Sequence, residues 1–417
     1  QNYSFVNGNV DFDTNEIRSE HDQLERATLF NAELVVDPEL ASASIVDIEA
    51  EERAQCKRQV QTALKLFLII GLIVSIIAIP IQLTKPKPLP KTLSPSESPS
   101  ESPSASPSQS LFGFLAGDSW NNAAALSTTD SSQQKALTWL KQSPLYYSFR
   151  DYVLLQFFVL AVFNYATGDI LSTQSWLQGN ETVYDFCKWE YIECNDGNNI
   201  ASLKTSSHQI SGSLPPEIGL LTSLNYLDLS SNTFNGTLPT EIGLLTNLMY
   251  LVLSANTFNG TLPTEIGLLT SLKYLVLYDN NFNGTLPTEI GLLTSLKYLY
   301  LYGNTFNGSL PTEIGLLTSH NYLDLDSNSF NGTLPTEIGL LTSLYLLSLF
   351  DNTFSGTLPT EIGLLTSLND LDLDSNTFNG TLPTEIGLLT SLNSLYLHNN
   401  FFNGTLPTEI GLLTSLN

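Results

Sequence analysis

The chain is poor in positive charge. Of its 417 residues only 16 are Lys or Arg, against 41 Asp or Glu, so the formal net charge is -25. Proteins that bind nucleic acid neutralise phosphates with clustered Lys and Arg side chains. The composition therefore excludes nucleic acid as a partner.

Cysteine and histidine are also scarce. Three cysteines in a chain of this length are too few for a disulfide scaffold. The four histidines lie far apart in the sequence, so they show neither the spacing of metal ligands nor a nucleophile–base pair. No set of acid, base and nucleophile converges anywhere, and we predict no enzyme, no metal site and no cofactor. The histidines are His21, His208, His320 and His398.

The first part of the chain predicts a tail and a membrane anchor. Residues 1–62 hold 13 acidic and 5 basic side chains without a sustained helix or strand period, which is typical of disorder. Residues 66–84 are uncharged and mostly apolar, between Lys65 and Lys85. As a helix they would extend about 28 Å, the thickness of a bilayer core. We predict a transmembrane helix over 63–84, too far from the N-terminus for a cleaved signal peptide.

Two further segments separate this anchor from the rest. Residues 85–110 alternate Pro and Ser and predict an extended stalk. Residues 111–199 predict a small helical unit with helices over 131–141 and 149–166, the second of them buried. The unit ends with Cys187 and Cys194, whose six intervening residues suit a local bridge.

From Ile200 the sequence repeats every 24 residues, through nine full units and a truncated tenth. In the unit that starts at Leu272, Leu275 and Leu277 alternate with outward residues, which predicts one short strand per repeat. Stacked units bury the apolar faces that none can bury alone. We predict that His208 and His320 replace structural residues, and that an asparagine row forms a buried hydrogen-bonded ladder. This row is Asn232, Asn256, Asn280, Asn304, Asn328, Asn352, Asn376 and Asn400.

The repeated pattern LxxLxLxxNxFxGxLPxEIGLLTSL resembles the plant-type leucine-rich repeat, over 200–417. Cys187 and Cys194, with Trp189 between them, resemble the N-terminal cap of plant receptor-like ectodomains. The resemblance implies an α/β fold, namely a curved solenoid with a parallel β-sheet on its concave face and a helical, disulfide-bonded cap. Here the predicted membrane span precedes the repeats, an order similar to membrane-anchored repeat proteins of microalgae and unlike plant receptor kinases. Kinase motifs are absent from the sequence.

The outward strand positions vary between repeats, whereas the TLPTEIGLLTS half is nearly constant. Aromatic side chains beside acidic ones on a rigid concave sheet predict a surface that binds a protein, a peptide or a glycan. The acids favour a basic partner. In an alternative interpretation the tyrosines stack on one another and the acids only maintain solubility. The predicted ligand-binding residues are Tyr278, Tyr300, Tyr302, Asp324, Asp326, Phe350, Asp372 and Asp374.

Glycosylation sequons recur once per repeat at most positions, and one lies in the predicted cap. Asn-Gly also suits a turn, which is the alternative explanation of this row. Flanking charge alone barely decides the orientation of the predicted membrane span. The sequons and the paired cysteines both indicate that everything after residue 84 lies outside the cell. Cys56 would then lie in the cytosol, free or palmitoylated. The predicted glycosylation sites are Asn180, Asn235, Asn259, Asn283, Asn307, Asn331, Asn379 and Asn403.

These observations predict a single-pass plasma-membrane protein with a cytosolic N-terminus and an extracellular, receptor-like recognition surface, with a membrane co-receptor as a further partner. A structural, adhesive or ice-binding surface is the alternative, because threonines recur in regular rows. The chain breaks off inside a repeat at Leu416 and Asn417, and we interpret it as a fragment.

Overall fold

The computed structural model describes residues 128, 130–143, 151–168 and 185–416. The predicted tail over 1–62, the transmembrane helix over 63–84, the stalk over 85–110 and part of the cap lie outside the described residues. Within the described ranges, no helix is long and apolar enough to cross a bilayer.

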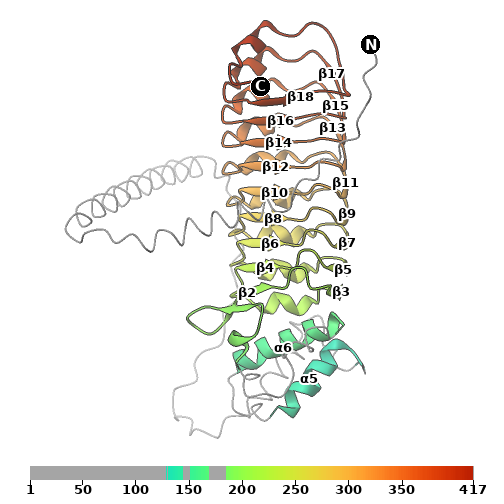
Figure 1. The fold of residues 1–417 in the computed structure, drawn as a ribbon, viewed down its shortest axis with the longest axis vertical. Coiled ribbons are helices and arrows are strands. Elements are labelled where there is room, and N and C mark those ends of the chain that lie inside the picture. Colours follow the sequence, from blue (N-terminus) through green and yellow to red (C-terminus); the bar gives the residue numbers. More distant parts are fainter. Residues whose placement is uncertain (1–127, 129, 144–150, 169–184, 417) are drawn as a thin grey trace, which may run out of the picture. The chain divides into compact units, whose positions relative to one another are not determined.

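Residues 200–416 form a solenoid in which each repeat contributes a strand, a second short strand and a 3-10 helix (Figure 1). Among the described residues the first sheet has ten strands, parallel except at β1. They are β1 Ile192–Cys194, β2 Ile200–Lys204, β4 Tyr226–Asp228, β6 Tyr250–Val252, β8 Tyr274–Val276, β10 Tyr298–Tyr300, β12 Tyr322–Asp324, β14 Leu346–Ser348, β16 Asp370–Asp372 and β18 Ser394–Tyr396.

The second sheet and the 3-10 helices form the other two sides of each turn. The second-sheet strands are β3 Ser211–Ser213, β5 Thr233–Gly236, β7 Thr257–Gly260, β9 Asn281–Gly284, β11 Thr305–Gly308, β13 Ser329–Gly332, β15 Thr353–Gly356, β17 Thr377–Gly380 and β19 Phe401–Phe402. The 3-10 helices are η4 Pro216–Leu220, η5 Thr240–Leu244, η6 Thr264–Leu268, η7 Thr288–Leu292, η8 Thr312–Leu316, η9 Thr336–Leu340, η10 Thr360–Leu364, η11 Thr384–Leu388 and η12 Thr408–Leu412.

The second sheet was not predicted from the sequence, which indicated one strand per repeat. In β9, Phe282 is buried while Asn281 and Asn283 are exposed, so the period-two alternation of a strand is present. The alternation is only three residues long and ends at Gly284, whose φ is +74°. So short a signal beside a glycine cannot be told from a turn without the neighbouring strands.

The core consists of stacked identical side chains. Leu275, Leu277 and Ile290 of one repeat are fully buried, as are their equivalents in the neighbouring repeats. Because the strands pair with Leu275 opposite Leu299 and no shift of register, each side chain packs on its own copy. The phenylalanines of the second sheet do the same and form a continuous spine from Phe234 to Phe402.

The predicted asparagine ladder is confirmed. The side-chain oxygen of Asn280 accepts a hydrogen bond from the backbone N–H of Phe258 at 3.0 Å. Its amide group donates to the carbonyls of Leu253, Leu277 and Tyr278 at 3.0–3.2 Å. The ladder satisfies buried backbone groups where the chain leaves the first sheet for the second, since an unpaired buried donor or acceptor is costly.

The spacing between stacked rings indicates which side of the solenoid is the inner one. Tyrosine rings on that sheet, from Tyr226 to Tyr322, stack with centroids 4.3–4.9 Å apart. The phenylalanine rings of the spine are 5.8–6.1 Å apart. Equivalent rings in successive repeats are related by one repeat. Their shorter spacing at the first sheet indicates that neighbouring repeats lie closer together there than in the core. The first sheet is therefore concave.

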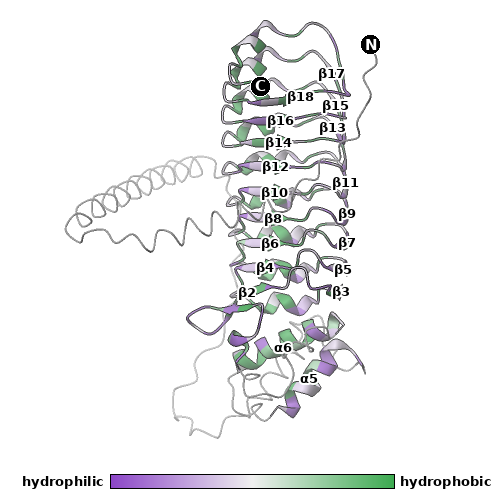
Figure 2. Ribbon diagram, viewed as in Figure 1, coloured by the Kyte–Doolittle hydropathy of each residue, from purple (hydrophilic) through white to green (hydrophobic). Residues whose placement is uncertain are grey.

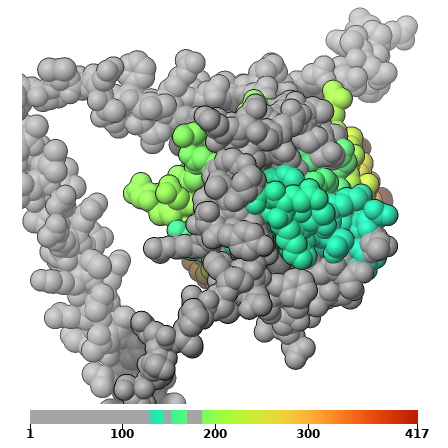
Figure 3. All heavy atoms as spheres, turned by 90° about the horizontal axis from the view of Figure 1, so that it is seen from below, coloured from blue at the N-terminus to red at the C-terminus, as the bar shows by residue number. Residues whose placement is uncertain are grey.

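The cap covers the first repeat with α5 Ser132–Gln142 and α6 Asp151–Ala166, close to the predicted bounds (Figures 1 and 3). Ser131 caps α5, because its hydroxyl accepts from the backbone N–H of Gln134 at 3.0 Å. Phe163 of α6 lies against Phe234, with ring centroids 6.0 Å apart. The apolar run of α6 is thus a buried helix that closes the end of the solenoid core.

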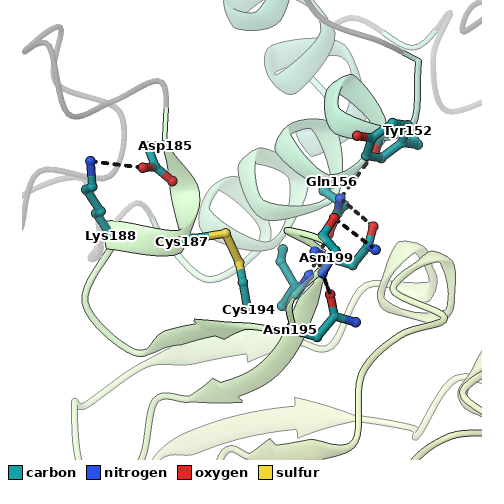
Figure 4. The surroundings of a disulfide bond; sticks show 10 residues. Tyr152, Gln156, Asp185, Cys187, Lys188, Cys194, Asn195 and Asn199 are labelled. Atoms are coloured by element: carbon teal, nitrogen blue, oxygen red, sulfur yellow. Dashed lines mark hydrogen bonds and ion pairs between the residues drawn. A yellow bond between two sulfur atoms is a disulfide. The ribbon is translucent and has the colours of Figure 1, made fainter.

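A disulfide joins Cys187, in the 3-10 helix η3 Phe186–Lys188, to Cys194 at the end of β1 (Figure 4). The bridge implied by the cap resemblance is therefore present. Beside it, the side-chain oxygen of Gln156 accepts from the backbone N–H of Ile200 at 2.7 Å, which ties α6 to the first strand of the repeats.

Candidate functional site

The concave face is built from the residues that flank each buried strand leucine. In β10, Leu299 is buried, whereas Tyr298 and Tyr300 are only partly covered and face away from the core. A third outward row follows each strand and includes Tyr302. All eight predicted ligand-binding residues belong to the second or third row, so the structure places them on one surface.

Tyrosines form one half of this surface. Tyr278 and Tyr302 stack with ring centroids 4.4 Å apart and an interplanar angle of 7°. Tyr300 is the last residue of β10, with its ring centroid 6.2 Å from that of Tyr298 on the same strand. The self-stacking considered as an alternative is therefore real. It leaves the rings partly exposed on a rigid sheet, so stacking does not remove them from the surface.

The phenol groups of Tyr300 and Tyr302 stay protonated at physiological pH. Burial, followed by the charge of Asp324, raises the pKa of Tyr300 above its usual value. Burial, followed by the neighbouring Tyr278, raises the pKa of Tyr302 in the same way. Both side chains therefore present neutral hydroxyls, which can donate and accept hydrogen bonds.

Aspartates form the other half of the surface. Strand pairing places Asp324 of β12, Ser348 of β14 and Asp372 of β16 in one row across the sheet. One oxygen of Asp326 accepts from the hydroxyl of Ser348 at 2.5 Å and from the backbone N–H of Phe350 at 2.8 Å.

Burial disfavours the charged form of these carboxylates and so raises their pKa. It is the largest cause of the raised pKa of Asp324, followed by repulsion from Asp326. Burial also raises the pKa of Asp326 and that of Asp372. After Lys297 the sequence contains no Lys or Arg, so these repeats hold no Lys or Arg to neutralise the cluster. A bound cation would supply that charge.

Some of the aspartates also have structural roles that the sequence did not reveal. Asp324 and Asp372 each accept from the backbone N–H two residues on, at 3.2 and 2.9 Å, as in an Asx-turn. Asp374 accepts from the backbone N–H of His398. Its other oxygen lies 3.1 Å from Nδ1 of His398, a largely exposed side chain that the prediction omitted. The position of His398 in the third outward row was the signal for it.

The structure thus brings most of the predicted residues together. Tyr300 of β10 pairs with Asp324 of β12, Tyr302 and Asp326 follow these two strands, and Phe350 stands one repeat after Asp326. Phe350 is 38% exposed, which is high for so large an apolar side chain. Tyr278 borders this group on one side, and Asp372 and Asp374 border it on the other. In the described ranges no three His, Cys, Asp or Glu side chains gather as they would around a metal ion.

The sequon asparagines lie on a different face. Those of the repeats are exposed, on or directly after the second-sheet strands. Asn180 lies outside the described residues. Glycans on this side would leave the concave sheet uncovered.

Comparison with known proteins identifies the repeats. The family model of the Leucine Rich Repeat matches residues 223–245, 271–293, 295–317 and 391–413. The solenoid is built from leucine-rich repeats. A curated relative, Leucine-rich repeat protein 1 of Arabidopsis thaliana, is 37% identical over 56 residues, which are 13% of this chain and 24% of the relative.

Solved structures show the same solenoid in plant receptor ectodomains. The leucine-rich-repeat ectodomain of the receptor kinase GASSHO1/SCHENGEN3 of Arabidopsis thaliana, in complex with CASPARIAN STRIP INTEGRITY FACTOR 2, is 30% identical with a TM-score of 0.56. That match covers 57% of this chain and 29% of the other. The Arabidopsis receptor kinase HAESA, in complex with the peptide hormone IDA and the co-receptor SERK1, is 32% identical with a TM-score of 0.53. It covers 60% of this chain and 42% of the other.

A third solved structure is of a protein named for a different activity. A plant ice-binding protein is 26% identical with a TM-score of 0.50, over 61% of this chain and 87% of the other. The chain spans less than half the length of the receptor structures named above.

Proposed function

We propose that this leucine-rich-repeat protein is a membrane-anchored recognition protein that binds a cationic peptide or protein segment on its concave face, outside the cell. One observation carries the proposal, namely a patch of partly exposed aromatic rings directly beside partly buried carboxylates whose repeats contain no Lys or Arg. Tyr300 and Phe350 would supply apolar contact, and Asp324 and Asp326 would attract a Lys or Arg side chain.

The likeness to receptor ectodomains supports this choice. The structures of GASSHO1/SCHENGEN3 and HAESA each hold a partner named above, and both are similar to this solenoid at 30% identity or more. A co-receptor is accordingly a second proposed partner. No catalytic family is indicated by these comparisons, and we propose recognition without enzymatic activity.

Removing the aromatic patch should weaken ligand binding. A screen of cationic peptides against the protein would supply a ligand, and Tyr300→Ala, Tyr302→Ala and Phe350→Ala together should raise its Kd at least about tenfold, because buried aromatic anchors carry most interface energy. Isothermal titration calorimetry measures this. Tyr226→Ala with Tyr250→Ala is the matched control, since these rings also stack but lie at least three repeats before Asp324 and Asp326. An unchanged Kd in the triple variant, or an equal loss in the control, contradicts the proposal.

The predicted topology has an independent test. If the repeats are extracellular, the native protein should lose mass on treatment with an N-glycosidase, because seven exposed sequons lie along the second sheet. Mass spectrometry before and after treatment measures the change. The absence of any mass shift would contradict the proposed orientation while leaving the peptide-binding result to stand by itself.

Ice binding is the second candidate, favoured by the similarity to a plant ice-binding protein and by exposed threonine rows. One such row is Thr237, Thr261, Thr285, Thr333, Thr357, Thr381 and Thr405. Most of these threonines belong to sequons, and a glycosylated face cannot be flat and bare. A thermal-hysteresis assay on the glycosylated protein separates the two functions.

A further inference from the structure

Eight leucines form an exposed apolar stripe along the 3-10 helices. Each occupies the last position of its helix, and each is between 47% and 56% exposed. Figure 2 shows hydrophobic colouring on these helices in successive repeats. We name this row the leucine stripe. It consists of Leu244, Leu268, Leu292, Leu316, Leu340, Leu364, Leu388 and Leu412.

Packing within the solenoid covers only part of the surface of each of these leucine side chains. A Cβ placed on Gly267 would lie 3.2 Å from Cδ1 of Leu292, so this leucine rests against the glycine of the preceding repeat. The other side of the residue remains open to solvent. Together the exposed halves form an apolar surface on the order of 400 Å², a size at which patches are usually functional.

A row of carboxylates runs beside the leucine stripe. Each 3-10 helix has a glutamate in its first turn, three residues before the leucine, as with Glu289 and Leu292 of η7. The nearest polar partner of that carboxylate is the adjacent Thr288 hydroxyl at 3.3 Å. No ion pair of a described lysine reaches these glutamates. The helix side of the solenoid therefore combines an apolar row with a parallel acidic row.

Both rows lie away from the other functional surfaces. The helices form the outer side of the curve, whereas the concave sheet carries the proposed ligand site. The sequon asparagines of the described repeats lie on or directly after second-sheet strands, and none of these lies on a 3-10 helix. Glycans on those asparagines would be anchored beside the leucine stripe, not on it.

We infer that the leucine stripe docks a basic amphipathic α-helix from a partner protein. Apolar side chains four residues apart on a helix are separated by about 6 Å along its axis. The repeat step in the core is 5.8–6.1 Å, and the step on the outer side of the curve is at least as long, so such a helix can reach three or four successive leucines. Lys or Arg side chains on one flank of that helix would then face the glutamate row.

A second copy of the chain is a poorer occupant for two reasons. Residues 200–415 hold 17 acidic and 3 basic side chains, a net charge of -14 (3 minus 17), so two copies add like charge. The leucine stripe also lies on the outer side of a curved solenoid, and two convex faces meet over only a few repeats. A single helix needs only three or four leucines and brings opposite charge.

The test uses the full chain and a synthetic helical peptide of about 20 residues, with Leu at every third or fourth position and Lys along one flank. Fluorescence anisotropy measures its Kd. Leu268→Gln, Leu292→Gln, Leu316→Gln and Leu340→Gln combined should weaken binding at least about tenfold. The matched control is Thr270→Gln, Thr294→Gln, Thr318→Gln and Thr342→Gln, at exposed positions two residues further on. It should stay within about twofold of the unmodified chain.

A second variant keeps the test independent of folding. Glu265→Gln, Glu289→Gln, Glu313→Gln and Glu337→Gln alter no apolar packing and should weaken the Lys peptide but not a peptide with Gln in place of Lys. Equal binding by the unmodified chain and the leucine variant would overturn the inference. So would tight binding of a peptide with Glu in place of Lys. Self-association that the leucine variant abolishes, without peptide binding, would assign the stripe to a second copy instead.

Discussion

Gly315→Ala should destabilise the solenoid by about 2–3 kcal/mol, although it adds only one methyl group. The glycine has an ordinary backbone conformation, so strain in φ is not the cause. A Cβ at this position would lie 2.6 Å from the carbonyl oxygen of Glu337 and 2.8 Å from its Cβ, both in the next repeat. The repeats would have to separate, and the buried leucines on either side would lose contact. Urea unfolding followed by circular dichroism measures the change.

Gly411→Ala is the matched control for this prediction. Gly411 lies in the same local sequence, TEIGLLTS, but in this chain no atom lies within 4 Å of a Cβ placed there. Any effect of alanine on the 3-10 helix itself is therefore common to both variants. Equal stability changes at Gly315 and Gly411 would show that local helix preference, and not contact between repeats, sets the requirement for glycine.

His320→Leu should stabilise the protein, and much more at pH 4.5 than at pH 7.5. His320 occupies a position that is leucine in the neighbouring repeats and is fully buried. Its Nδ1 lies 3.2 Å from the carbonyl oxygen of Leu296, and its Nε2 is unpartnered among the described residues. Burial lowers the pKa of His320 to about 4, although the Leu296 carbonyl favours the protonated ring.

The direction of the pH effect follows from this lowered pKa. Above pH 6.5 the ring is neutral in both the folded and the unfolded chain, and its titration costs nothing. As the pH falls below 6.5, His320 binds a proton in the unfolded chain but stays neutral in the folded chain. The free energy of unfolding therefore decreases down to about pH 4. The loss is about 3 kcal/mol at its largest. The free energy of unfolding of both proteins, measured by urea between pH 4 and 8, should converge toward neutral pH.

Leu344→His tests whether position alone causes this behaviour. Leu344 is the fully buried equivalent of His320 in the next repeat. The variant should be less stable than the unmodified protein and should lose stability more steeply between pH 6.5 and 4. If the difference in stability between either histidine and leucine at these positions did not depend on pH, the buried imidazole would not be the responsible group.

Much of the fold could be predicted because the same residue pattern recurs in nine full repeats. A spacing of 24 residues without insertion fixes which leucines share a face, and hence the first sheet, the asparagine ladder and the places of His208 and His320. The second sheet could not be predicted, because residues 281–284 contain a single buried side chain between two polar ones. Only the pairing of neighbouring repeats makes that segment a strand.

The candidate site was predicted as a surface but not as a set of contacts. Outward positions such as Tyr300 and Asp324 follow from strand alternation. The bonds of Asp326 to Ser348 and Phe350 depend on side-chain torsions, which the sequence does not encode in any visible pattern. The exposed leucines were not predicted, because each stands directly beside a buried leucine in the sequence. The 3-10 geometry turns Leu292 outward and its neighbour Leu293 inward.

The short repeat step of the concave sheet sets a register for any ligand that lies along it. Three steps of 4.3–4.9 Å span about 13–15 Å. Four residues of an extended peptide span nearly the same length, at about 3.3 Å each. The repeat step and the rise per peptide residue differ, so the two coincide only about every three repeats and four residues. Tyr300 and Asp372 are three repeats apart in one row, so an extended ligand would meet them with residues four positions apart. A cationic peptide bound in the proposed way would therefore carry an apolar residue at Tyr300 and a Lys or Arg four positions later at Asp372.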